Sequence, residues 1–446
     1  MSTDTNSTVL GVVVIIRHGD REGFYQDPST YDASETTITA VGSVQEVQLG
    51  TLLRSIYLND SSSSRIQSMS STALFNASQF VIRADAGDEG EVIVDSANAL
   101  TQGLFPNSSF YNTTLANGTT VEGPLNGYQY VPIDTLDSST NIEFQGFTSC
   151  STFTTYVNNF YNSTEFKAKA NESATFLSDL APYLDGRPVN LQNMWNIFDF
   201  MNVNSIHNAT FLNSLPPTYL AQTRALANWH QYNSFSDPSI NGIGNVAGRT
   251  VIPSTLSYMQ RMGNSSDGLA FAVQAMSYKP FLSLFNMTGA AEANSSLAAI
   301  VDYAAALALE VRQGSSGEKV VRFNFKNGTS QDDFVTYNIF GTEGDLPLST
   351  FVDNLAPTGV NTTAEWCSVC SNSVDRGCGA LALASQAALA TVHHNKISPV
   401  GAGFLGAGLT LAVVAICFGV LAFLGILTIG RRSRRATKQG SEDGKF

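Results

Sequence analysis

The feature that most restricts the fold of this chain is an apolar segment near its C-terminus. Residues 400–430 contain no charged side chain and are rich in Leu, Val, Ala, Phe and Gly. About 20 apolar residues are enough for a helix to cross a bilayer, so 400–430 is predicted to be a transmembrane helix. Four arginines follow within residues 431–435, and basic flanks of a membrane helix usually stay in the cytoplasm. The segment therefore predicts a single-pass type I membrane protein with a basic cytoplasmic tail at 431–446.

The distribution of charge agrees with this topology. The 446 residues carry a net charge of −13, but residues 431–446 alone carry +4, so the rest of the chain carries −17. An acidic body argues against nucleic-acid binding, which depends on basic side chains. Apolar residues make up 43% of the chain and charged residues only 14%, which excludes a disordered protein and a coiled coil. We therefore expect residues 1–395 to form a folded ectodomain, either extracellular or in the secretory or vacuolar lumen.

Sequons and cysteines support a domain outside the cytosol. The pattern Asn-x-Ser/Thr occurs 14 times between Asn6 and Asn361, which predicts a glycosylated surface. Four cysteines precede the apolar segment, namely Cys150, Cys367, Cys370 and Cys378. An even number in an oxidising compartment predicts two disulfides, whose pairing stays open. A metal site at Cys367 and Cys370 is not expected, because no second pair of ligands accompanies them.

The N-terminus leaves a second topology open. Residues 1–8 have no basic region, and the apolar run 9–16 is only eight residues long. Neither has the pattern of a signal peptide. Two explanations are open: the sequence starts downstream of the true N-terminus, or targeting relies on the C-terminal helix alone. In the second case the chain is a tail-anchored protein whose body lies in the cytosol.

The first 105 residues alternate between strand and helix patterns. The β-branched run Val9–Ile16 is typical of a strand buried on both faces of a parallel sheet, and residues 39–58 have apolar side chains at helical spacing. A second strand at 79–83 and a second helix at 92–104 repeat this order. The repetition predicts an α/β core in which a mostly parallel sheet is flanked by helices.

The later part of the chain predicts an insertion into this core. Residues 106–237 are rich in Tyr, Phe and Asn and have helical patterns, so we expect a mostly α-helical cap subdomain. The core, which begins with residues 1–105, is expected to resume at about 238–345. Within it, the alanine content of residues 297–311 favours a helix. Residues 346–395 contain three of the cysteines and form a separate segment before the membrane helix.

Three residues directly after the first predicted strand form the strongest candidate site. Arg17, His18 and Arg21 follow the end of that strand, where α/β sheets bind ligands, and Gly19 lets the backbone approach closely. Guanidinium groups match phosphate oxygens in bidentate geometry. Two neighbouring cations also lower the pKa of an imidazole and keep it neutral and nucleophilic. The pattern therefore predicts that His18 attacks phosphorus and forms a phosphohistidine while both arginines stabilise the phosphoryl charge.

The segment VVVIIRHGDREGF resembles the signature of the histidine phosphatase superfamily, in its acid phosphatase branch with a phosphoglycerate mutase-like fold. The resemblance continues more weakly to about residue 330, through IRADAG, DSANALTQGLFP and SYKPF. It implies that His18 is the nucleophile and that Arg17 and Arg21 bind the phosphate of a monoester substrate. It also implies an α/β core with a helical cap, secretion, glycosylation and disulfides. No cofactor or metal is expected.

The chain departs from that family at two places. The family has a further arginine on the loop after its next core strand, but the loop here reads GDEGEV, and Arg83 is the only nearby substitute. The family also places a His-Asp pair after a late strand, where this chain reads Ser-Tyr-Lys-Pro. Lys279 could replace the charge of the histidine as a phosphate ligand, but Pro280 cannot donate a proton to the leaving oxygen. His207 and His230 are interpreted as ordinary histidines.

These departures leave three functions open. The first is a membrane-tethered acid phosphatase that hydrolyses phosphate monoesters through phosphorylated His18. The second is a pseudophosphatase that binds phosphorylated ligands without efficient turnover, because the arginine expected on the second loop and the His-Asp pair are not found. The third is a structural cell-surface glycoprotein in which the pocket has no function.

Overall fold

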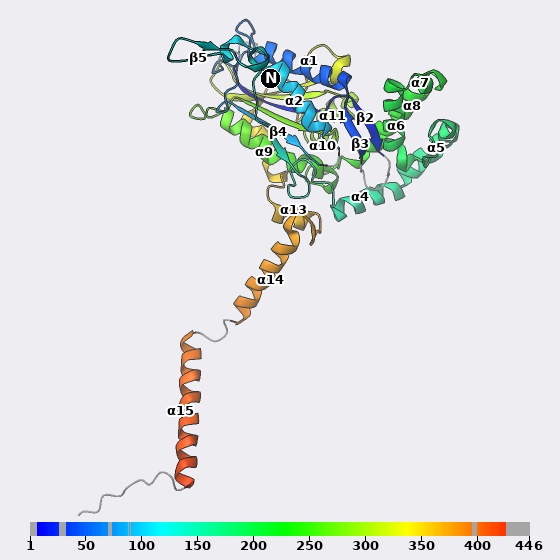
Figure 1. Cartoon of the computed structure of the whole chain (residues 1–446). Coiled ribbons are helices and arrows are strands. Elements are labelled where there is room, and N and C mark those ends of the chain that lie inside the picture. Colours follow the sequence, from blue (N-terminus) through cyan, green and yellow to red (C-terminus); the bar gives the residue numbers. More distant parts are fainter. Residues whose placement is uncertain are drawn as a thin grey trace, which may run out of the picture. The chain divides into compact units, whose positions relative to one another are not determined.

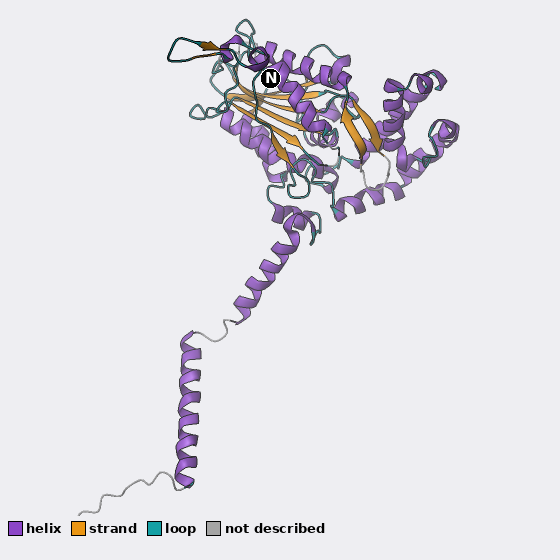
Figure 2. Cartoon of the chain, viewed as in Figure 1, coloured by secondary structure: helices purple, strands orange, loops and turns teal. Residues whose placement is uncertain are grey.

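The computed structural model of the chain describes residues 7–25, 33–69, 74–87, 89, 91–394 and 399–424 (Figure 1). The chain divides into two compact units, residues 1–379 and residues 380–446. The first unit contains a central β-sheet with helices on both faces and a group of helices at one side (Figures 1 and 2). The α/β fold predicted from the sequence is confirmed.

The predicted first strand is the centre of the sheet. It forms β1 (Thr8–Arg17), which pairs with β8 (Phe271–Met276) in parallel and with β9 (Ala306–Gln313) antiparallel. The side chains of residues 12–16 are fully buried. Because successive side chains of a strand point to opposite faces, Val12 joins one hydrophobic cluster and Val13 another. A continuous β-branched run suits this position, since both faces of the strand are covered.

The sheet is mixed, with its strands in the order β11-β10-β9-β1-β8-β4-β7, and β12 also pairs with β10. The remaining strands of this sheet are β4 (Phe80–Asp85), β7 (Asp134–Leu136), β10 (Lys319–Lys326), β11 (Val335–Thr336) and β12 (Leu346–Pro347). Strands β1, β8, β4 and β7 run parallel, as expected, whereas all pairings of β9 and β10 are antiparallel. The parallel half of the sheet combines β1 and β4 of the predicted strand–helix repeat with β8 and β7, which lie outside residues 1–105.

Helices cover the two faces of the sheet. The expected helices 39–58 and 92–104 are α1 (Ala40–Tyr57) and α2 (Val92–Leu104), which share one hydrophobic cluster with Val12. The opposite face packs against α9 (Val246–Met262) and α10 (Lys279–Met287). α1 begins where the Thr39 side chain accepts a hydrogen bond from the Gly42 N–H, as N-cap residues commonly do.

The helical group consists of five helices between the first and second halves of the core. They are α4 (Ser151–Asn162), α5 (Thr164–Leu180), α6 (Met194–His207), α7 (Ala209–Ser214) and α8 (Tyr219–Ser234). Their buried side chains are mostly aromatic and aliphatic and join the cluster on the α9 face of the sheet. A two-stranded sheet of β2 (Arg21–Tyr25) and β3 (Ala33–Ile38) also contacts α6. Short elements complete the first unit: β5 (Thr113–Thr114), β6 (Thr120–Val121), α3 (Pro124–Gly127) and α11 (Ala290–Ala293).

One expectation about the core is wrong. Residues 297–311 were expected to favour a helix, but they contain a loop followed by β9. The alanines and leucines of β9 are buried between β1 and β10. Helix propensity is a weak preference of tenths of a kcal/mol per residue, and burial with full strand pairing on both sides outweighs it.

The end of the first unit is held by two disulfides. Cys150, at the start of the helical group, pairs with Cys370, and Cys367 pairs with Cys378. The sequence predicted two disulfides without a pairing, and the structure supplies it. This segment contains α12 (Leu348–Leu355), α13 (Thr363–Val369) and the start of α14 (Cys378–His394).

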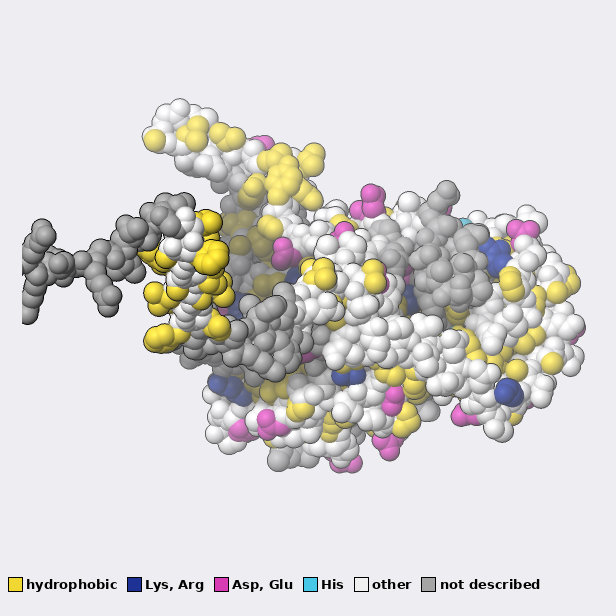
Figure 3. Space-filling model, turned by 90° about the horizontal axis from the view of Figure 1, so that it is seen from below, with side chains coloured by type: hydrophobic (Ala, Val, Ile, Leu, Met, Phe, Trp, Pro, Cys, Tyr) yellow, Lys and Arg dark blue, Asp and Glu magenta, His cyan; other side chains and the backbone are white. Residues whose placement is uncertain are grey.

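The predicted membrane segment is helical. α15 (Pro399–Phe423) is long and apolar enough to cross a membrane, by length and composition alone. Its large side chains are exposed, and hydrophobic side chains cover its visible surface (Figure 3). Residues 425–430 and the basic tail at 431–446 lie outside the described part of the chain.

Candidate active site

The candidate site surrounds the short turn between β1, which ends at Arg17, and β2, which begins at Arg21. The N–H of Gly19 in this turn donates to Oγ of Ser96 in α2 at 3.0 Å. A Cβ atom on Gly19 would lie 2.6 Å from the carbonyl oxygen of Gly42 in α1. The close backbone approach that the sequence predicts is therefore present, and it requires glycine.

His18 is completely buried at the centre of the site. Its Nδ1 lies 2.8 Å from the carbonyl oxygen of Gly19, and because a carbonyl only accepts, Nδ1 carries the proton in this contact. Its Nε2 lies 2.8 Å from Oε2 of Glu89. Burial lowers the pKa of His18, with Glu89 acting in the opposite direction and Arg17 and Arg21 lowering it further. The arginines thus act as expected on the imidazole, but burial is the larger cause.

Glu89 places a carboxylate at Nε2 of His18, the nitrogen of the predicted nucleophile. Its other oxygen, Oε1, lies 3.6 Å from Nζ of Lys279, and its backbone carbonyl accepts a hydrogen bond from the Thr36 hydroxyl at 2.5 Å. Burial acts to raise the pKa of Glu89, but the charges of His18 and Lys279 outweigh it and lower the pKa. Among the described residues, neither Nε2 of His18 nor Oε2 of Glu89 has a partner with hydrogen-bond geometry, so the 2.8 Å approach is an electrostatic contact. An anionic oxygen therefore occupies the position next to Nε2.

Arg17 provides a second cation beside the imidazole. Its Nη1 donates to the carbonyl oxygen of Val301, and its guanidinium lies 4.5 Å from the ring centre of Tyr303. That ring is in turn 5.5 Å from the imidazole of His18. Among the described residues, neither Nε of Arg17 nor the buried hydroxyl of Tyr303 has a hydrogen-bond partner. Polar groups are thus available to a ligand at this point.

Arg21 connects the core to the helical group. It is fully buried, and its Nη2 donates to Oδ1 of Asp199 in α6 at 2.9 Å. Its Nη1 donates to the carbonyl oxygen of Gly23 at 2.8 Å. Burial raises the pKa of Asp199, Glu89 raises it further, and Arg21 and Arg17 oppose this. A carboxyl group from the helical group therefore belongs to the same charge cluster.

A cavity of about 190 Å³ lies between α6 and the core. Arg17 and Asp199 line it together with Tyr303, and the ion pair of Arg224 with Asp302 lies in its wall. The cavity gives a small molecule direct access to the guanidinium of Arg17.

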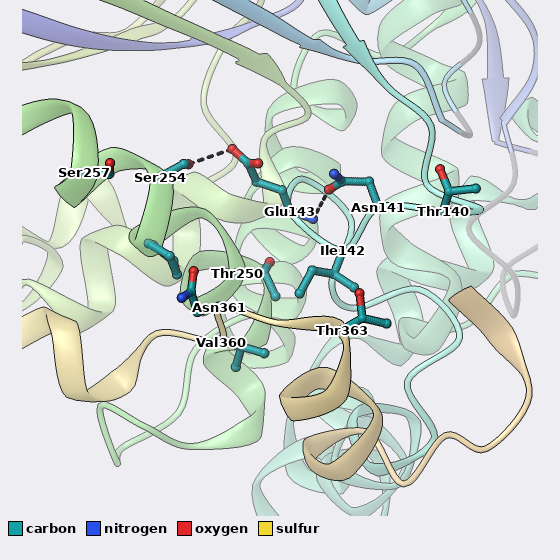
Figure 4. Close-up of a pocket in the computed structure, with 11 residues that line it drawn as sticks. Thr140, Asn141, Ile142, Glu143, Thr250, Ser254, Ser257, Val360, Asn361 and Thr363 are labelled. Carbon is teal, nitrogen blue, oxygen red and sulfur yellow. Dashed lines mark hydrogen bonds between the residues drawn. The ribbon is translucent and has the colours of Figure 1, made fainter. Parts of the chain in front are cut away.

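Arg83 lies in a different cluster from the other predicted phosphate ligands. Its Nη1 pairs with the carboxylate of Glu143 at 2.6 Å and reaches the hydroxyl of Tyr258 at 3.4 Å. Glu143 also accepts hydrogen bonds from Ser254 Oγ and lines a separate cavity of about 340 Å³ (Figure 4). None of the described contacts of Arg83 is with His18. The structure thus brings His18 and Lys279 into contact with Glu89, places Arg17 and Arg21 near His18, and leaves Arg83 apart.

The two histidines interpreted as ordinary differ in their surroundings. Nε2 of His207, at the end of α6, lies 2.8 Å from Oδ2 of Asp20, which is buried in the β1–β2 turn. This contact joins the helical group to the core. His230 is buried inside the helical group, with Nε2 3.0 Å from the Tyr161 hydroxyl. Burial lowers its pKa to about 3.

Comparison with known proteins decides the family. The family model described as histidine phosphatase superfamily (branch 2) matches residues 23–251, which is half of the chain. The chain belongs to this superfamily. The match begins two residues after Arg21, so the turn with Arg17, His18 and Arg21 is recognised from its own sequence and geometry. A comparison with curated proteins gives no match.

Solved structures agree with a histidine phosphatase fold. A Hafnia alvei phytase in complex with tartrate is similar with a TM-score of 0.54 and 11% identity, over 80% of this chain and 98% of that one. A Klebsiella sp. ASR1 phytase has a TM-score of 0.52 and 12% identity, over 81% and 99%. A Citrobacter braakii phytase has a TM-score of 0.51 and 12% identity, over 82% and 99%. At such low identity the likeness shows the fold alone.

Three residues of this histidine phosphatase site were missed by sequence reasoning. Glu89 lies in the acidic loop GDEGEV, where the family has an arginine. The sequence shows the acid but not that its side chain contacts His18. Asp199 is the only acidic residue in the run MWNIFDFMNV, and a lone acid in an apolar helix was an available signal of a buried role. Nothing in the sequence distinguishes Tyr303 from other tyrosines.

Proposed function

We propose that this histidine phosphatase hydrolyses phosphate monoesters through a phosphohistidine at His18. The observation that supports this most strongly is the contact of His18 Nε2 with an anionic oxygen inside a buried cluster of cations. The cations are Arg17, Arg21 and Lys279. A buried carboxylate is expensive unless it is paired, so a pocket that holds one at Nε2 is built to hold negative charge there.

The geometry suits nucleophilic attack once that carboxylate is replaced by a phosphoryl group. The Gly19 carbonyl keeps the proton on Nδ1, and the lone pair of Nε2 is then directed at the phosphorus atom. Arg17 and Arg21 donate N–H groups to the phosphoryl oxygens and stabilise the charge that they carry in the transition state. Lys279 adds a point charge.

Kinetics with a chromogenic ester test this function. The complete chain in detergent is expected to release p-nitrophenol from p-nitrophenyl phosphate, and His18→Asn is expected to lower kcat by at least about 10³-fold. His207→Asn, which also removes an imidazole from a contact with the core, is the matched control and should stay within a few-fold of the unchanged protein. Full activity of the His18 variant would contradict the proposal.

A pseudophosphatase is the second candidate, and Glu89 is the observation that favours it. Its carboxylate lies where a substrate must bind, and Pro280 cannot supply a proton. A pseudophosphatase predicts that vanadate or phosphate binds and raises the melting temperature while neither aryl nor alkyl phosphates react. Turnover of p-nitrophenyl phosphate that depends on His18 excludes it.

We also propose that the first unit lies outside the cytosol, anchored by α15 as a type I membrane protein. Two disulfides support an oxidising compartment, and α15 is apolar enough to span a bilayer. Protease added to sealed vesicles from expressing cells is expected to leave the first unit intact and to remove only the tail at 431–446. If the protease digests the first unit while the vesicles stay sealed, that unit lies on the cytosolic face, which would support the tail-anchored alternative.

A further inference from the structure

Among the described residues of the site, three carboxyl groups are buried, namely Glu89, Asp199 and Asp20. Loss of an alkoxide from a phosphate ester requires a proton, and a positioned acid contributes about 10²–10⁴-fold to the rate. Pro280 cannot supply it. Oδ2 of Asp20 accepts from the Thr39 hydroxyl at 2.6 Å and contacts Nε2 of His207, and Asp20 does not line the cavity beside Arg17. The remaining candidates are Glu89 and Asp199.

Glu89 is on the wrong side of the reacting phosphorus. In an in-line displacement the nucleophile and the leaving oxygen lie on opposite sides of the phosphoryl group. Oε2 of Glu89 contacts the nucleophilic nitrogen itself, and Oε1 faces Lys279. A group that competes for the space next to Nε2 cannot also stand behind the leaving oxygen.

Asp199 lies beside Arg21, a phosphate ligand under the proposed function, and faces the cavity next to it. Its Oδ1 is 2.9 Å from Nη2 of Arg21, so it adjoins an oxygen of a phosphate bound to that guanidinium. It also lines the 190 Å³ cavity with Arg17, and that cavity provides the space between α6 and the core for the rest of an ester. On the basis of the proposed function, we infer that Asp199 of the helical group is the acid that protonates the leaving oxygen.

Burial supports this role. It favours the neutral carboxyl and raises the pKa of Asp199, and the negative charge of Glu89 acts in the same direction. A bound phosphate dianion adds negative charge beside Arg21 and strengthens the effect. Two carboxyl groups with opposite pKa shifts in one site are the usual arrangement when one is the acid.

The inferred step transfers the phosphoryl group to His18 and one proton to the departing alcohol. The Nε2 lone pair of His18 forms the N–P bond while the P–O bond to the alcohol breaks, and the carboxyl proton of Asp199 passes to the leaving oxygen. The products are the free alcohol, phosphohistidine and the Asp199 carboxylate. In the second half, a water attacks the phosphohistidine, Asp199 takes one of its protons, and the N–P electron pair returns to His18. Phosphate leaves and the acid is restored.

A simple positioning role for Asp199 is the competing explanation, because the carboxylate holds Arg21. Asp199→Asn separates the two, since the amide oxygen still accepts from Arg21 but no acidic proton remains. We expect kcat for glycerol 2-phosphate to fall by about 10²–10⁴-fold, and kcat for p-nitrophenyl phosphate, whose leaving group needs little help, to fall by less than about tenfold. The Kd for vanadate should change by less than a few-fold.

The outcomes are distinct. Equal losses on the two substrates assign Asp199 to positioning and overturn the inference, while the proposed function stands. Failure of the unchanged protein to turn over either substrate overturns both. Asp302→Asn, in the wall of the same cavity, is the control and should affect both substrates alike.

A measurement on the unchanged protein is independent of any folding defect in the variant. The rate with glycerol 2-phosphate is expected to fall at high pH as the acid loses its proton, and the rate with p-nitrophenyl phosphate should fall much less over the same range. Identical profiles for the two substrates would also overturn the inference.

Discussion

The carboxylate of Glu89 lies 2.8 Å from Nε2 of His18, the nitrogen that attacks phosphorus in the proposed function. The same carboxylate is paired with Lys279 at 3.6 Å. Under the proposed function, phosphate must displace this charged side chain from its contacts with His18 and Lys279. The free energy needed to displace Glu89 weakens the binding free energy of every anionic ligand by the same amount.

Removal of this competing charge should strengthen anion binding. We expect Glu89→Gln to tighten phosphate and vanadate binding by at least about tenfold, which corresponds to about 1.4 kcal/mol. Calorimetric titration checks this, and Glu91→Gln, an exposed acid two residues away, is the control. Unchanged or weaker binding by Glu89→Gln would show that the carboxylate does not stand in the phosphate position.

The same substitution should alter stability in a ligand-dependent way. Breaking one member of a buried ion pair typically costs about 3–5 kcal/mol, because the other charge is left unpaired. Without phosphate, Glu89→Gln should therefore lower the melting temperature, and millimolar phosphate should restore it more than it stabilises the unchanged protein. Equal ligand-induced shifts for the two proteins would argue against a shared position.

Arg21 and Arg83 should respond differently to the same substitution. Arg21 adjoins Asp199 in the His18 cluster, and Arg83 pairs with Glu143 in another cluster. We expect Arg21→Gln to lower kcat/KM for p-nitrophenyl phosphate by about 10²-fold or more, and Arg83→Gln to reduce thermal stability with little effect on KM. A large increase in KM for Arg83→Gln would place this arginine in the phosphate site, as the sequence suggested.

His230 should make the helical group sensitive to acid. Its pKa is lowered to about 3 by burial, against about 6.5 in an unfolded chain. A depressed folded-state pKa gives stability that is present above pH 6.5 and is lost as the pH falls towards 3, because the unfolded chain binds the proton first. Between pH 7 and 4 the loss should be about 3 kcal/mol. His230→Gln should remove most of this pH dependence in thermal unfolding, and an unchanged dependence would contradict the assignment.

Glycosylation provides a separate test of the compartment. Ten of the described sequon asparagines are exposed: Asn59, Asn76, Asn107, Asn117, Asn162, Asn171, Asn208, Asn264, Asn294 and Asn361. If the first unit enters the secretory pathway, several should carry N-glycans, and an N-glycosidase should reduce the apparent mass of the native chain by many kilodaltons. A chain whose mass does not change would favour a cytosolic body.

The parts of the fold that could be predicted are those in which local pattern and tertiary environment agree. The β-branched run of β1 and the helical spacing of α1 and α2 each match the burial that the fold gives them. β9 could not be predicted, because its alanine-rich sequence favours a helix and only pairing with β1 and β10 makes it a strand.

The candidate site likewise contains residues that the sequence could predict and residues that it could not. Arg17, His18 and Arg21 are neighbours in sequence and could be proposed together, because one turn brings them together. Glu89 and Asp199 come from a loop and from a helix far along the chain, and their approach to His18 is set by packing that no short motif records. Arg83 was a reasonable substitute by position, but it faces Glu143 and Tyr258.

Direct detection of the phosphorylated residue tests the central claim most sharply. The unchanged protein and Glu89→Gln are mixed with radiolabelled p-nitrophenyl phosphate, quenched within milliseconds in alkali, which preserves phosphohistidine, and digested for peptide mapping. The account predicts a label on the peptide that contains His18, more of it in Glu89→Gln, and none in His18→Asn. Turnover with no labelled peptide, or a label that persists in His18→Asn, would contradict it.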